Sequence, residues 1–337
     1  MRKLAFCALL LALVALPAAA ATDPLALVPP DATAVGMLRL ADVRTSPWAP
    51  RLFSEADRAT MDGDAARFLA DAHLKPTEDL DTIVFAALPA RDGAHGSGVA
   101  ILEGRFDAAS VEAALVARGA VKRSVAGGAL LILPENDAHP HGGEPGALAF
   151  LDRHLAVAGP QPAVESVLAR AASGARSDFR TGAGLGRQLH RVPTDATGWV
   201  LVDLSRQAAR VKAHEAEAHA HAEAGEEGAR QLMQVSSLVK QVPLLAMSAT
   251  LRPDAMTLTA FGQCDDAETR GDLEDSLRGL LAAWRLSVQD AKPDLLPVIR
   301  SFKVTQGKDG VSLSGKVPGA ALASFFEKAQ AHAHEAH

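Results

Sequence analysis

Cysteine is nearly absent from this chain, and its scarcity excludes one way of stabilising the fold. The 337 residues contain two cysteines, Cys7 and Cys264. Cys7 lies in an N-terminal segment that we expect to be removed, so the remaining protein has one cysteine and no intramolecular disulfide. The fold must therefore rest on burial of the large aliphatic content, and a chain of this length can bury a sizeable core.

Long apolar runs are also absent, except at the N-terminus. Arg2 and Lys3 precede an apolar run at residues 4–16, which is followed by a proline and four alanines. A membrane-spanning helix needs about 20 apolar residues, so this run is too short. A basic start, an apolar centre and small residues at the end predict a secretory signal peptide over residues 1–21. Because Cys7 lies inside the apolar centre rather than at its end, we expect no lipid anchor.

Basic charge is in deficit. Cleavage after Ala20 or Ala21 removes two of the 34 basic residues and none of the 40 acidic ones, which leaves a net charge of −8. This charge makes nucleic acid an improbable partner. No second apolar run approaches membrane length and no basic amphipathic helix is evident. We expect an exported protein of the periplasm or the extracellular space that does not span the membrane.

Familiar catalytic motifs are missing as well. The chain contains no Gly-x-Ser-x-Gly elbow, no Walker loop and no His-Glu-x-x-His helix. The glycine-rich segment 181–186 follows a predicted helix rather than a strand, so it is typical of a flexible linker and not of a dinucleotide loop. Catalytic triads are defined by geometry and not by spacing. The absence of motifs therefore leaves an enzyme as an open alternative.

The chain contains a sequence that occurs twice. Val-Pro-Pro-Asp-Ala-Thr at 28–33 precedes an apolar strand at 34–40, and Val-Pro-Thr-Asp-Ala-Thr at 192–197 precedes another at 198–204. In each half a predicted hairpin and an acid-capped helix follow. The hairpins are 82–88 with 98–104 and 244–251 with 256–262; the helices run from 107 to 118 and from 265 to 284. Later strands are predicted at 129–133, 147–151, 155–158, 302–305 and 311–316, and later helices at 162–172 and 320–329.

This order predicts an α+β fold made of two similar units. Each unit begins strand, helix, strand, strand, helix, strand, which is the order of ferredoxin-like split βαβ units. We expect mainly antiparallel sheets with helices on one face. The predicted boundaries are 22–172 for the first unit, 173–190 for the linker, 191–330 for the second unit and 331–337 for a His-rich tail.

Four short segments carry a resemblance to a known class of proteins. They are Val-Pro-Pro-Asp-Ala-Thr at 28–33, Asp-Leu-Asp at 79–81, Glu-Gly-Arg-Phe-Asp at 103–107 and Leu-Ala-Val-Ala-Gly at 155–159. Over residues 28–330 the chain resembles uncharacterised exported bacterial proteins of the domain-of-unknown-function type. The resemblance implies a fold more than a function, and it brings no catalytic residues with it.

A few polar residues are candidates for chemistry, each with a simpler interpretation. Asp79 and Asp81 form a pair suited to acid–base work, although aspartates are also favoured in turns. Arg105 is placed to bind an anion at a helix start, but Asp107 occupies that cap. Cys264 precedes two aspartates that disfavour its thiolate, so we interpret it as a buried thiol.

Histidine is the one unusual feature of the composition. His214, Glu217 and His221 lie in an Ala/Glu-rich segment, 205–241, which we predict to be helical because alanine and glutamate favour helix. On a helix these three side chains share a face, and imidazole with carboxylate suits Zn²⁺, Ni²⁺ or Cu²⁺. The alternative is that the pairs are ordinary solvent-facing i,i+4 contacts and that no cofactor is bound.

Two classes of function are consistent with the sequence. The first is a non-enzymatic binding or structural protein of the bacterial cell envelope, whose partner is an unknown ligand or envelope protein; periplasmic metal binding through histidines is a variant of it. The second is an enzyme, either a hydrolase or metal-dependent, with a site between the two halves. A polar cluster between the halves would favour the enzyme, whereas an apolar groove would favour binding.

Overall fold

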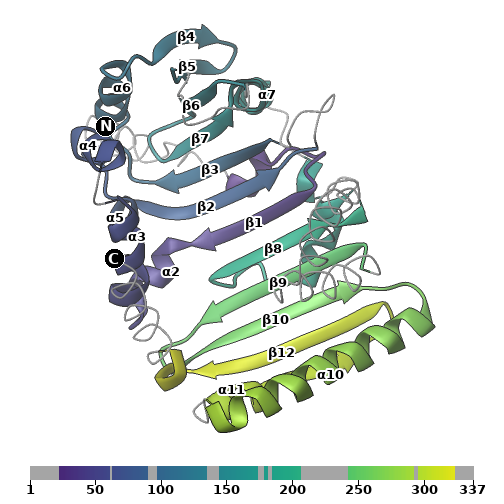
Figure 1. The fold of residues 1–337 in the computed structure, drawn as a ribbon. Helices are drawn as coiled ribbons and strands as arrows, with labels where there is room; N and C mark the ends of the chain where they lie inside the picture. Colours follow the sequence, from purple (N-terminus) through teal and green to yellow (C-terminus); the bar gives the residue numbers. More distant parts are fainter. Residues whose placement is uncertain are drawn as a thin grey trace, which may run out of the picture.

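The computed structural model describes residues 23–60, 63–89, 97–134, 144–173, 178–180, 184–205, 242–291 and 295–322. Twelve strands form one continuous sheet in which every neighbouring pair is antiparallel (Figure 1). The spatial order is β11-β12-β10-β9-β8-β1-β2-β3-β7-β6-β5-β4. The strands are β1 (Ala34–Arg39), β2 (Leu80–Ala87), β3 (Gly98–Gly104), β4 (Val121–Val125), β5 (Gly128–Ile132), β6 (Gly146–Phe150), β7 (Leu155–Pro160), β8 (Gly198–Asp203), β9 (Leu244–Leu251), β10 (Ala255–Gln263), β11 (Lys303–Gln306) and β12 (Gly310–Pro318).

The two halves of the chain meet where β1 pairs with β8. Gly36 pairs with Val200 at the centre, and Ala34–Val202 and Leu38–Gly198 lie two positions to either side. Gly36 and Val200 each lie three residues after the threonine that ends a duplicated sequence, Thr33 or Thr197, so equivalent positions of the two segments pair at the centre. On each side the next neighbours are the two strands of a hairpin, β2 with β3 and β9 with β10.

One face of the sheet, which we call the core face, carries the main hydrophobic core. Its strand residues include Val35, Val84, Ile101, Val157 and Leu201, each fully buried. The elements that cover them are α7 (Gln161–Ala172) and three short 3-10 helices, η1 (Pro24–Leu27), η2 (Asp178–Arg180) and η3 (Leu185–Arg191).

The opposite face carries helices only toward its two outer edges. Toward β4, α6 (Ala108–Val116) and the chain around α4 (Gly63–Asp71) pack on Leu148 and Phe150. Toward β11, α10 (Ala267–Ala291) packs Leu273 against Val311 and also contacts α11 (Leu296–Ser301). The remaining helices, α2 (Leu40–Thr45), α3 (Ala49–Thr60) and α5 (Pro76–Asp79), follow β1 at one end of the strands (Figure 1).

The predicted α+β class with a mainly antiparallel sheet is confirmed. Two details differ from expectation. Helices pack on both faces rather than on one, because strands such as β6 carry apolar residues on both faces: Ala147 and Ala149 lie in the main core, and Leu148 and Phe150 pack against α6. The neighbour order is not that of a split βαβ unit, since β1 pairs directly with β2 and is antiparallel to it despite the intervening helices.

The described helices include none that combines the length and apolar character needed to cross a bilayer.

Candidate functional site

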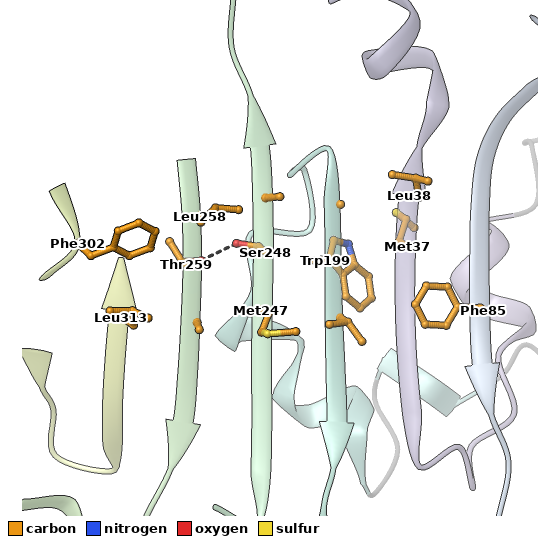
Figure 2. Close-up of a pocket in the computed structure, with 14 residues that line it drawn as sticks. Met37, Leu38, Phe85, Trp199, Met247, Ser248, Leu258, Thr259, Phe302 and Leu313 are labelled. Atoms are coloured by element: carbon orange, nitrogen blue, oxygen red, sulfur yellow. Dashed lines mark hydrogen bonds between the residues drawn. The ribbon is translucent and has the colours of Figure 1, made fainter. Parts of the chain in front are cut away.

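The face of the sheet opposite the core face is called the open face below, and an apolar groove crosses its middle, between α6 and α10. It has a volume of about 540 Å³ and extends from β2 to β12. Phe85 and Phe302 lie at its two ends (Figure 2). The lining residues are Met37, Leu38, Phe85, Gly198, Trp199, Val200, Met247, Ser248, Ala249, Leu258, Thr259, Ala260, Phe302 and Leu313.

Strand register arranges the groove side chains in two rows. Successive side chains on a strand point to opposite faces, and paired residues point to the same face. The first row consists of Phe85, Gly36, Val200, Met247, Ala260 and Leu313, each paired with the next. The second row consists of Leu38, Gly198, Ala249, Leu258 and Gly315, also paired in sequence. The core-face residues Met37, Trp199, Ser248 and Thr259 lie between the rows along their strands.

Two glycines let aromatic rings lie against the sheet. A Cβ built on Gly36 would lie 2.1 Å from Cζ of Phe85, and one built on Gly315 would lie 2.6 Å from Cδ1 of Phe302. Gly198 differs, because its nearest atoms would be 3.6 Å away, at Cδ1 of Leu38 and the Met37 carbonyl oxygen. Gly198 and its partner Ala249 thus form a low floor between larger neighbours.

Large apolar side chains remain exposed around this floor. Leu38 is 38% exposed, Phe85 is 44% exposed and Met247 is 43% exposed. Trp284 of α10 is 45% exposed, and its ring centroid lies 6.3 Å from that of Phe302. Large contiguous patches of exposed apolar surface commonly mark binding sites, whereas single exposed apolar side chains do not.

The described part of the groove lining is poor in polar groups. Among the described residues that line it there is no acid, base, cysteine or histidine. The hydroxyl groups of Ser248 and Thr259 hydrogen-bond to each other at 2.6 Å, while the backbone groups of the central strands are engaged in sheet pairing. The groove is therefore suited to holding apolar groups by contact alone.

The predicted metal ligands His214, Glu217 and His221 lie outside the described residues, as does most of the segment 205–241. Within the part of the chain that the structure describes, no cluster of three metal-ligating side chains occurs. The metal hypothesis for this segment stays a prediction.

The paired aspartates have structural roles. The Asp79 carboxylate accepts a hydrogen bond from the Lys75 amide at 2.7 Å, at the start of α5. Asp81 forms an ion pair with Arg44 at 2.9 Å and lies 3.8 Å from Arg105. Arg105 also donates a hydrogen bond to the carbonyl of Glu78. These contacts tie α2 and α5 to β2 and lie apart from the groove.

The remaining candidates are also structural. The Asp107 carboxylate accepts hydrogen bonds from the hydroxyl and amide of Ser110, and these hold the pKa of Asp107 below its usual range. Cys264 is 1% exposed. Burial raises the pKa of the Cys264 thiol; Arg270 acts in the opposite direction, and Asp265 adds to the rise. A thiol with a raised pKa is a poor nucleophile, as the sequence interpretation expected.

Sequence reasoning did not identify the groove. One signal of it is the unbroken apolar run 244–247 in β9, because a strand with water on one face alternates between apolar and polar residues. Val200, Leu201 and Val202 of β8 give the same signal. Both strands therefore present apolar side chains to two faces, and the described elements leave one of these faces uncovered.

Comparison with known proteins shows similarity at the level of the fold. No protein-family model matches the chain, and no curated protein matches it. Crystal form III of TP0453 aligns with a TM-score of 0.52 and 11% identity, over 90% of this chain and 98% of that chain. Crystal form I of the same protein aligns with a TM-score of 0.49 and 13% identity, over 90% and 96% of the two chains. At this identity, the alignment with crystal form III shows that this chain shares its fold with TP0453.

Proposed function

We propose that this chain is an exported, non-enzymatic binding protein of the bacterial cell envelope, and that the groove is its ligand site. The observation that carries the proposal is the groove's lining, whose described residues are apolar except for Ser248 and Thr259, and these two hydroxyl groups hydrogen-bond to each other. An enzyme site between the halves requires converging polar groups. The volume of about 540 Å³ lies within the range of about 300–1,000 Å³ typical of small-molecule sites.

The proposal includes an internal repeat. The duplicated sequences at 28–33 and 192–197 precede β1 and β8, which pair symmetrically about Gly36 and Val200. The hairpins follow on each side in the same spatial order. The groove crosses this symmetric junction, so its floor includes strands from both halves.

Export is the second part of the proposal, and it rests on the signal-peptide pattern of residues 1–21. Protein isolated from the envelope of the expressing bacterium should begin at Ala21 or Thr22 when its N-terminus is sequenced. Recovery of intact Met1 from a membrane-embedded form would contradict export with cleavage.

The binding function can be tested with an uncharged apolar dye, N-phenyl-1-naphthylamine, which fluoresces when it leaves water. The delipidated mature protein should bind the dye saturably. Gly198→Leu should abolish binding because the new side chain fills the groove floor, where a Cβ is tolerated. Thr257→Leu is the matched control, since Thr257 lies on an exposed position of the opposite face of β10. Equal dye binding by both variants would refute the groove as the site.

A further inference from the structure

We infer that the occupant of the groove is the hydrocarbon chain of a single-chain lipid, lying across the strands with its polar head in solvent. This inference rests on the proposed function and names its ligand class. The argument uses the charge of the lining, the length of the groove and its width.

The charge of the lining selects an uncharged, non-hydrogen-bonding occupant. None of the lining side chains carries a charge, and the two hydroxyl groups hydrogen-bond to each other. A ligand polar group placed on this floor loses its hydrogen bonds to water and gains none in exchange. The complementary surface is therefore hydrocarbon, and a charged or polar head must lie beyond the lining.

The length of the groove matches a long acyl chain. The first row crosses six adjacent strands, β2-β1-β8-β9-β10-β12. Five spacings between strands of about 4.8 Å give a length of about 24 Å. An extended hydrocarbon advances about 1.25 Å per carbon, because its single bonds of about 1.5 Å zigzag. A chain of about 20 carbons would extend along the first row from Phe85 to Leu313.

The width of the groove favours one chain over a helix. The two rows are two residues apart along the strands, which corresponds to about 7 Å. An α-helix with its side chains is about 10–12 Å across, so it would rest on the side chains of the rows instead of entering the space between them. Between the rows the groove is lined by Met37, Trp199, Ser248 and Thr259, whose side chains point to the core face, so the floor there is backbone. The space between the rows accommodates one chain, which favours a free fatty acid or another single-chain lipid over a two-chain phospholipid.

The test measures displacement of N-phenyl-1-naphthylamine from the delipidated protein by saturated fatty acids of 8 to 24 carbons. Affinity should rise with each added methylene, by up to about fourfold for full burial, and should level off at about 20 carbons. A chain-brominated fatty acid should quench tryptophan fluorescence; Trp284→Phe should remove the contribution of Trp284, which contacts Phe302, and leave that of the lining residue Trp199.

Two variants keep the test independent of folding. Gly198→Leu and Ala249→Leu both fill the low floor and should lose fatty-acid binding while keeping the thermal midpoint of the starting protein. Thr257→Leu should keep both properties. If one groove variant misfolds, the other still tests the site.

The contrary outcomes separate the inference from the proposed function. The single-chain inference would be overturned if the dye binds but its displacement does not depend on fatty-acid chain length, or if a sterol displaces it more strongly than any fatty acid. Either result would leave an apolar-binding function. Absence of dye binding would contradict the function itself. A dimer that Gly198→Leu converts to monomer, with no fatty-acid binding, would identify a second copy of this chain as the occupant and overturn the inference.

Discussion

Gly36 supports the ring of Phe85, and replacing it with alanine tests how the groove wall is built. The new Cβ would lie 2.1 Å from Cζ of Phe85, well inside van der Waals contact, so the ring must leave the sheet. Phe85 is already 44% exposed, so its loss of burial is partial. Full burial of a phenylalanine contributes about 1.5–3 kcal/mol, so eviction of this half-buried ring costs about 1–1.5 kcal/mol.

Gly198→Ala is the matched control, because a Cβ at Gly198 would displace no aromatic ring. Replacing a glycine in a compatible conformation stabilises a protein by about 0.4–1 kcal/mol through the unfolded chain. That gain should appear at Gly198, where the nearest atoms to a new Cβ are 3.6 Å away, and should be offset at Gly36. We expect the free energies of unfolding of the two variants to differ by about 1–1.5 kcal/mol, the amount estimated for eviction of the ring.

The assay is urea unfolding of both variants, each also made in a Phe85→Ala background. Without the ring, Gly36→Ala should behave like Gly198→Ala, so a double-mutant cycle isolates the contact. The evicted ring should also enter the groove and weaken binding of N-phenyl-1-naphthylamine severalfold. If the two glycine variants have equal stability in the presence of Phe85, the ring does not depend on Gly36 and the reasoning is refuted.

Three further outcomes are expected. Phe179→Ala should lower the free energy of unfolding in urea by about 3–5 kcal/mol, because Phe179 is 2% exposed and a large cavity replaces it; a loss below 1 kcal/mol would contradict its core role. Hydrogen bonding to Arg191 holds the pKa of Asp309 below its usual range, so the carboxylate stabilises the fold above its unfolded pKa, and this stabilisation is lost as pH falls through the lowered pKa; Asp309→Asn should therefore be less stable than the starting protein at neutral pH and should match it in acid. Zinc titration should reveal one saturable site that is lost on combined His214→Ala and His221→Ala, and absence of binding would leave that segment as a polar insertion.

The sequence predicts strands well where a half-buried or fully buried run is bounded by turn residues. The strands at 98–104 and 244–251 have the predicted bounds. β4 is the main omission, because Val-Lys-Arg-Ser-Val has three polar residues in succession and no apolar alternation. Its strand conformation comes from pairing with β5, and as the last strand of the sheet it exposes both faces. An edge strand of this kind leaves little signal in its own sequence.

The groove was not predictable for a different reason. Its floor depends on the pairing of β1 with β8, which joins residues more than 150 positions apart. β8 and β9 carry apolar residues on both faces, which indicates that both faces avoid water. This pattern does not show whether a helix or a ligand covers the second face. That distinction depends on where α6 and α10 lie, which follows from the tertiary packing.

The symmetric junction itself explains why the groove is open. In each half, a helix that follows the hairpin, α6 or α10, covers the outer strands of the open face. Pairing β1 with β8 removes two edges that each half alone would expose to aggregation. The same pairing places the two covering helices toward opposite ends of a twelve-stranded sheet, too far apart to meet over its centre. The central strands are therefore left with an apolar face that the described elements do not cover, and this is the surface on which we place the ligand.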